Sequence, residues 1–128
     1  MEFPDELRYT QTHEWARRQG NRVCVGITEH AQHEISDVVF VELPKVNGEA
    51  VKGKGISVVE SVKAAFDIYA PVSGKVVQAN SVLESNPALV NEDPYGRGWF
   101  FEIEMSDPRE WENLLNAEQY KAQCITTH

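Results

Sequence analysis

One lysine stands out because it lies between two β-prone stretches. Lys63 belongs to Glu60-Ser61-Val62-Lys63-Ala64, which separates the apolar runs 55–60 and 65–70. Such runs joined by a short turn predict a β-hairpin with Lys63 at or beside its tip. A modifying enzyme can reach an amine there and join it to a carboxylic cofactor such as lipoate or biotin. Spacing alone favours a simpler interpretation, an unmodified lysine on an exposed turn.

A second stretch comes close to a phosphate-binding loop. Residues 48–54 read Gly-Glu-Ala-Val-Lys-Gly-Lys. That motif requires Ser or Thr after the lysine, and a helix whose amides face the phosphates. Gly55 stands where the motif requires Ser or Thr, and a strand-like run follows where the motif requires a helix. We therefore interpret residues 48–54 as a turn.

Histidine and cysteine give no complete reactive site in the sequence. His30, His33 and Glu34 could form one side of a metal site on a helix, but zinc requires further ligands. We predict a solvated helix surface there and no metal. Cys24 and Cys124 lack CxxC spacing, and the apolar run around Cys24 predicts a small buried side chain. No catalytic constellation is present, so we expect a non-enzymatic protein.

Short strands dominate the predicted structure. Runs rich in Val, Ile and Phe and bounded by Gly, Pro or Asn have the composition of strands. We predict strands at residues 22–27, 38–43, 55–60, 65–70, 74–79 and 99–104.

Helices are expected at two places. Thr28 can cap a short helix over 29–35, because its hydroxyl can accept a hydrogen bond from the first turn. Asp107-Pro108-Arg109-Glu110 has the pattern of another helix start, with Asp as the cap and Pro at the first position. We therefore expect C-terminal helices over about 107–124 that close a β-rich core.

The sequence also contains a weak internal repeat. Val46–Val51 and Val72–Val77 share the pattern V-x-G-x-x-V and flank the predicted hairpin. A small barrel or sandwich with approximate two-fold symmetry would leave such a pair. Chance is an equally good explanation for so short a match.

Composition limits the class of protein. The 128 residues fit one domain, 1–128, and the net charge is −8 from 12 basic and 20 acidic residues. That charge argues against nucleic acid and anionic membranes as partners. No apolar run approaches the roughly 18 residues of a membrane span. Residues 1–6 are acidic and resemble neither a secretory signal nor a transit segment, so we expect a cytoplasmic protein.

The lysine motif resembles a known family. Glu60–Ala64, followed by Ala70-Pro71-Val72-Ser73-Gly74, resembles the lipoylation site of glycine cleavage H proteins. Further segments resemble the family in chain order: Tyr9–Trp15, Val25–Gln32, Val39–Pro44, Leu89–Gly96 and Gly98-Trp99. The resemblance implies a mainly β fold with short helices, a barrel-sandwich hybrid of two antiparallel sheets followed by C-terminal helices.

The resemblance also implies a carrier function. Lipoate would be attached to Lys63, with Glu60, Ser61, Val62 and Ala64 forming the attachment motif. The arm would take an aminomethyl group from a pyridoxal-phosphate glycine decarboxylase to a tetrahydrofolate-dependent aminomethyltransferase, and dihydrolipoyl dehydrogenase would reoxidise it. A lipoate-attaching enzyme is the fourth partner. The implied protein is a monomer of the bacterial cytoplasm, or of the mitochondrial matrix if the chain is a processed eukaryotic one.

A cleft for the loaded arm is expected as well. H proteins shelter the arm, and we expect Glu14 and Asp67 to hold its amine in the charged form, since a nearby carboxylate favours the charge. A protonated amine has no lone pair with which to expel the sulfur. Apolar neighbours such as Ile27 or Phe66 would keep bulk water away. His30 either lines the same cleft or lies on the surface.

Related carriers differ at the residues beside the lysine. Lipoyl domains of 2-oxo-acid dehydrogenase complexes usually have Asp before it, whereas this chain has Val62. Biotin carriers usually place Met on both sides, whereas Val62 and Ala64 flank Lys63 here. A lipoate-relay protein, which passes lipoyl groups to other enzymes, is an alternative that the sequence leaves open.

Overall fold

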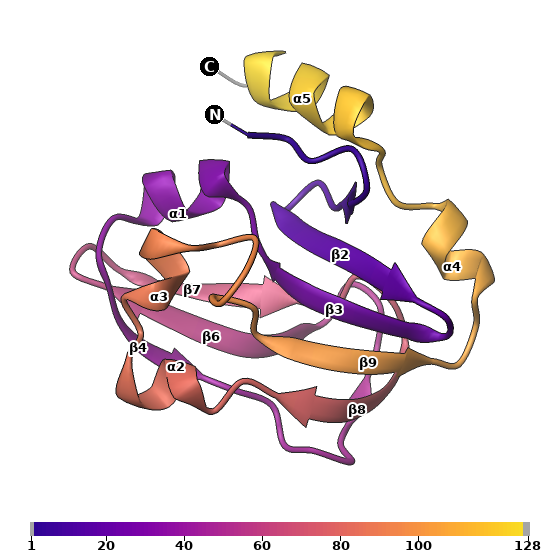
Figure 1. Cartoon of the computed structure of the whole chain (residues 1–128), viewed down its shortest axis with the longest axis horizontal. Coiled ribbons are helices and arrows are strands. Elements are labelled where there is room, and N and C mark those ends of the chain that lie inside the picture. Colours follow the sequence, from indigo (N-terminus) through magenta and orange to yellow (C-terminus); the bar gives the residue numbers. More distant parts are fainter. Residues whose placement is uncertain (1, 127–128) are drawn as a thin grey trace.

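Two antiparallel sheets form the body of the protein. The computed structural model describes the backbone of residues 2–126 and the side chains of 2–124. One sheet has the strand order β1-β2-β3-β9-β8-β5, and the other has the order β4-β6-β7 (Figure 1). The six strands of the first sheet are β1 (Arg8–Tyr9), β2 (Glu14–Gln19), β3 (Arg22–Ile27), β9 (Phe101–Met105), β8 (Gly74–Ala79) and β5 (Glu49–Ala50). Those of the second are β4 (Val38–Glu42), β6 (Gly55–Ser61) and β7 (Ala65–Tyr69).

All six predicted strands are present. The composition of the sequence did not indicate β1, β2 and β5. The predictions for β3 and β8 match their bounds, and those for β4, β6 and β7 are within one residue. The last predicted strand began at Trp99, whereas β9 begins at Phe101. The two-residue strands β1 and β5 have too little sequence to show a pattern, and β2 is polar over its second half.

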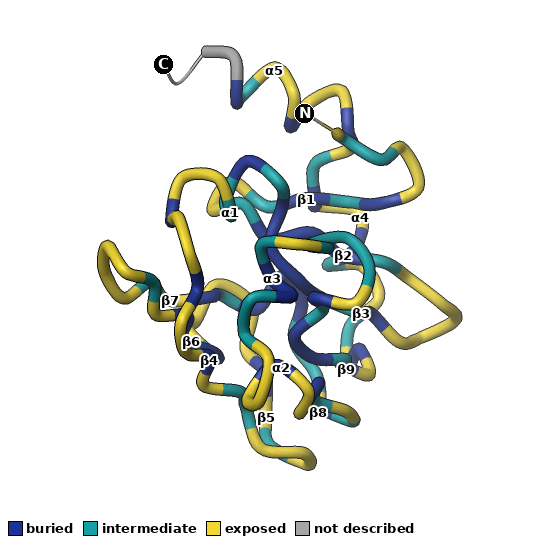
Figure 2. Tube along the Cα trace, turned by 60° about the vertical axis from the view of Figure 1, so that its left-hand side comes forward, coloured by how far each residue is buried: buried dark blue, intermediate teal, exposed yellow. Residues whose placement is uncertain are grey.

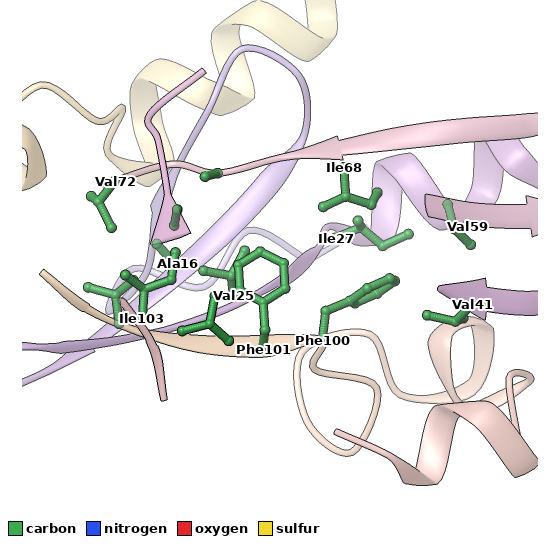
Figure 3. Close-up of a cluster of buried hydrophobic side chains, with 14 of the residues drawn as sticks. Ala16, Val25, Ile27, Val41, Val59, Ile68, Val72, Phe100, Phe101 and Ile103 are labelled. Atoms are coloured by element: carbon green, nitrogen blue, oxygen red, sulfur yellow. The ribbon is translucent and has the colours of Figure 1, made fainter. Parts of the chain in front are cut away.

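The hydrophobic core lies between the two sheets. Figure 3 shows Ile27 and Phe100 on one side of this layer, with Val41, Val59 and Ile68 opposite them. All five are at most 4% exposed. Burial of apolar area on both inner faces is what holds two sheets together.

Short helices cover the ends of the sandwich. They are α1 (Glu29–Ile35), α2 (Val82–Ser85), α3 (Leu89–Glu92), α4 (Arg109–Glu112) and α5 (Ala117–Thr126). Helix α1 has the predicted bounds, and the Thr28 hydroxyl accepts a hydrogen bond from Ala31 N at 3.1 Å. No helix within 2–126 is long and apolar enough to cross a membrane.

The C-terminal helices differ in detail from the prediction. The helix expected to start at Asp107 is the single turn α4, which Pro108 precedes as the cap. Asp107 still acts on this turn, since Oδ1 accepts a hydrogen bond from Arg109 N at 3.1 Å. Helix α5 is the second predicted piece, and it extends to Thr126. Residues 113–116 separate the two helices.

The two copies of the internal repeat pair with each other. Ala50 lies opposite Gly74 in the β5–β8 ladder, and Glu49 lies opposite Lys75. Val76 extends the pairing, since its carbonyl accepts from Asn47 N at 2.7 Å. An antiparallel pair of equivalent segments is locally two-fold symmetric. The structure thus favours symmetry over chance as the source of the repeat.

A second, smaller core joins the two ends of the chain. It contains Leu7, Tyr9, Trp15, Ala117, Tyr120 and Cys124. Tyr120 is completely buried and stacks on Tyr9 with ring centroids 4.6 Å apart. Figure 2 shows α5 beside the N-terminal segment, outside the main sandwich.

Candidate attachment site at the β6–β7 hairpin

Lys63 lies in the loop of the hairpin, as predicted. Strands β6 and β7 pair as far as Glu60 opposite Ala65, and Ser61 N donates to Ala64 O at 2.9 Å to close the loop. Figure 2 shows this loop as an exposed tip that projects from the sheet. The sequence therefore predicted correctly that Lys63 lies in the loop of this hairpin.

Ser61 shapes the loop that presents Lys63. Its hydroxyl oxygen accepts hydrogen bonds from Lys63 N at 3.1 Å and Ala64 N at 3.2 Å. A serine that bonds to the backbone two and three residues ahead stabilises a tight turn. Val62, which is 69% exposed, donates its N–H to Asp37 O at 3.0 Å and so ties the loop to the segment before β4.

The amine of Lys63 is suited to acylation. The side chain is exposed, and Nζ donates to the backbone carbonyl of Glu34 at 3.3 Å. Within the described part of the chain, no carboxylate forms an ion pair with it. Converting the ammonium group to a neutral amide would therefore break no ion pair, and the hairpin tip leaves room for a long substituent. The residues present fit a covalently attached carboxylic cofactor.

Glu14 is a buried carboxylate at the junction of the two sheets. It is 1% exposed and accepts hydrogen bonds from the hydroxyls of Thr10 and Thr12 and from Tyr69 N, the last at 3.1 Å. Burial raises the pKa of Glu14, and these hydrogen bonds oppose that shift. Sequence analysis missed these partners, although the spacing of Thr10, Thr12 and Glu14 places them on one face of an extended chain.

The two expected arm-holding carboxylates line different hollows. Glu14 lines a cavity of about 280 Å³, together with Tyr69 and Pro71. Asp67 is exposed and lines an open hollow of about 470 Å³. Tyr69 lines both, which places the two hollows next to each other along β7. Ile27 is 2% exposed and belongs to the main core.

The expectation of a solvated helix surface is wrong for His30. His30 is 8% exposed, and its ring lies 4.6 Å from that of His13, between centroids. His33, on the same helix, is exposed as predicted. The difference arises because α1 turns one face toward the N-terminal segment and α5, a contact that local sequence does not reveal.

Cys24 is also less buried than predicted. Its side chain is half-buried on β3, whereas Cys124 is buried in the smaller core. Burial raises the pKa of Cys24 to about 11, so the thiol is protonated at neutral pH. Neither the position nor the pKa makes Cys24 a reactive nucleophile.

Fold and site together define a class of protein. Two antiparallel sheets that present an exposed lysine on a hairpin tip form a lipoyl-domain-like carrier. The model of the family described as glycine cleavage H-protein matches residues 7–127. The chain therefore belongs to the glycine cleavage H-protein family, whose members are lipoyl carriers of the glycine cleavage system.

Individual relatives agree with this assignment. The chain is 52% identical to the glycine cleavage system H protein of Anaeromyxobacter sp. (strain K) over 122 residues, or 95% of each chain. It is 51% identical to that of Thermus thermophilus over 121 residues, or 94% of each. The crystal structure of a glycine cleavage system H protein from Mycobacterium marinum superposes with a TM-score of 0.85 at 35% identity, covering 94% of this chain and 98% of that one.

Proposed function

We propose that this chain carries lipoate on Lys63 and shuttles the aminomethyl group of glycine from glycine decarboxylase to aminomethyltransferase. Dihydrolipoyl dehydrogenase then reoxidises the dithiol of the arm. The observation that supports Lys63 is its amine, exposed on the hairpin tip with only a backbone carbonyl as its hydrogen-bond partner in the described chain. When bound, lipoate supplies a cyclic disulfide that accepts the group. The partners perform the catalysis, and this chain supplies the tether.

The attachment motif surrounds Lys63 with residues of different roles. Ser61 holds the loop, as its two backbone hydrogen bonds indicate. Val62 and Ala64 are exposed and leave the lysine stem unobstructed. Glu60, exposed at the end of β6, offers a carboxylate to the attaching enzyme. Since exposed carboxylates rarely stabilise a fold by more than about 1 kcal/mol, recognition is the better explanation for Glu60.

Glu14 and Asp67 are proposed to hold the charged amine of the loaded arm. They lie in adjacent hollows along β7, and an arm more than a dozen bonds long, at about 1.5 Å each, reaches well over 10 Å from Lys63. A carboxylate nearby raises the pKa of an amine, so the nitrogen stays protonated and its lone pair is unavailable. The residues thereby prevent premature loss of the one-carbon unit.

The attachment residue is tested by mass measurement after incubation with a lipoate ligase. The wild-type chain should gain one lipoyl group, and the chain with Lys63→Arg should gain none, because a guanidinium does not form the amide. Lys54→Arg is the matched control, since Lys54 is also exposed on a turn. A lipoyl group on the Lys63→Arg chain, or its loss from the Lys54→Arg chain, would refute the assignment.

A further inference from the structure

Three potential metal ligands meet where the two ends of the chain come together. One ring nitrogen each from His13 and His30 and the sulfur of Cys124 lie within 4.8 Å of one another. His13 precedes β2, His30 is on α1, and Cys124 is near the end of α5. Figure 1 shows that end of α5 above α1. None of the three ligands belongs to the β6–β7 hairpin, although Glu34 of α1 contacts both places, since its carbonyl accepts from Lys63 Nζ and its carboxylate lies beside His30.

Hydrogen bonds orient both imidazole rings. His13 Nδ1 lies 2.7 Å from the Tyr120 hydroxyl, which in turn lies 2.7 Å from the Thr28 hydroxyl. His30 Nε2 lies 3.3 Å from a carboxylate oxygen of Glu34. Each ring thus has one nitrogen engaged with a polar partner. Histidines that bind metals in proteins typically show this arrangement.

We propose that His13, His30 and Cys124 bind one Zn²⁺ ion, and that solvent fills the fourth position. Two imidazoles and a thiolate are ligands that Zn²⁺ prefers, and three protein ligands leave a fourth tetrahedral position open. His13 is only partly buried, which gives an ion and its water access to the cluster. Sequence spacing did not indicate this site, because its ligands come from three distant segments.

Binding of Zn²⁺ would release one proton. The ligand of the metal is the thiolate, so formation of the Zn–S bond breaks the S–H bond of Cys124, and the proton leaves to solvent.

The ion would link segments that hydrophobic contacts hold only in part. Helix α5 packs on the N-terminal segment mainly through Tyr120, Ala117 and Cys124. An ion bound by Cys124 and the two histidines would attach the end of this helix to α1 and to the start of β2. Since only the folded chain brings the three ligands together, Zn²⁺ should raise the melting temperature.

The test uses the full chain with Lys63→Arg, in reduced and metal-free form, because the thiols of an attached lipoyl group would compete for metal. Titration with Co²⁺ should produce a thiolate-to-metal charge-transfer absorption, and one equivalent of Zn²⁺ should displace it. A second substitution in this chain, Cys124→Ser, should abolish the absorption. Cys24→Ser in its place should leave the absorption unchanged, since Cys24 lies outside the cluster. Cys124→Ala is the second variant, used with circular dichroism as the check on folding.

Two variants of helix α1, at His30 and His33, supply a comparison that leaves Cys124 unchanged. His30→Ala should weaken Zn²⁺ binding by about tenfold or more, since loss of even an outer-shell partner costs that much. His33→Ala, on the exposed face of the same helix, should leave the affinity unchanged. Wild-type binding at pH 7 should release one proton per ion. The proposal is overturned by an absence of the absorption, by its loss in the Cys24→Ser chain, or by equal affinities in the two histidine variants.

Discussion

At the scale of single residues, Glu14 and Asp67 show how surroundings separate two similar side chains. Glu14 is buried and accepts a hydrogen bond from Tyr69 N, so its replacement would disturb the junction between the sheets. Asp67 is exposed, and no hydrogen bond or ion pair within the described residues involves its carboxylate. Asp67 can therefore be changed with little effect on the fold, which makes it the better probe of the arm.

Asp67→Asn should speed the release of formaldehyde from the chain loaded with aminomethyl, measured without the transferase. Each unit by which the amine pKa falls raises the neutral, reactive fraction about tenfold. Glu60→Gln is the matched control, because Glu60 is another exposed carboxylate of the same hairpin. Equal release from the wild-type and Asp67→Asn chains would show that Asp67 does not protect the arm.

At the scale of elements, the β8 strand depends on a glycine at its first position. Gly74 pairs with Ala50 on one side and Met105 on the other. A Cβ atom on Gly74 would lie 1.9 Å from the carbonyl oxygen of Glu104, and the φ of +156° is one that other residues rarely adopt. The repeat pattern V-x-G-x-x-V thus contains a residue that the packing of three strands requires.

Gly74→Ala should lower the free energy of unfolding by about 2–4 kcal/mol, because the added methyl group meets backbone that cannot move aside. Urea denaturation followed by tryptophan fluorescence measures this change. Gly55→Ala is the comparison, since a Cβ there would meet only the Asp67 side chain at 4.0 Å. A loss of stability as large in the Gly55→Ala chain would mean that the clash at Gly74 is not the cause.

At the scale of the whole molecule, Tyr120 links the end of the chain to its beginning. Its ring stacks on Tyr9 and meets Phe3 edge-on at 5.8 Å between centroids. Its hydroxyl lies within hydrogen-bonding distance of Thr28 and His13. One side chain therefore contributes both apolar packing and polar contacts to the closure of the smaller core.

Two variants of Tyr120 should separate these contributions, measured by urea denaturation with a chelator present. Tyr120→Phe keeps the ring and leaves Thr28 and His13 without their partner, which should cost about 1–3 kcal/mol. Tyr120→Ala also removes the ring and should cost about 3–5 kcal/mol. If the Phe variant were as unstable as the Ala variant, the ring stacking would contribute nothing, contrary to this account.

The features that the sequence determined by itself depend on near neighbours along the chain. Lys63 at the hairpin tip follows from two apolar runs around a four-residue turn, whose Ser61 bonds two and three residues ahead. The α1 helix follows in the same way from Thr28, which caps a first turn only three residues away. Local conformational preference decides such features before any tertiary contact forms.

Only the tertiary structure decided which distant residues meet. Glu14 and Tyr69 are 55 positions apart, and His13 and Tyr120 are 107 apart. The same holds for Cys124, which reaches His13 and His30 only because α5 folds back over the N-terminal segment. Burial of apolar side chains such as Tyr9 and Tyr120 drives that return, and it brings polar neighbours together that share no spacing pattern in the sequence.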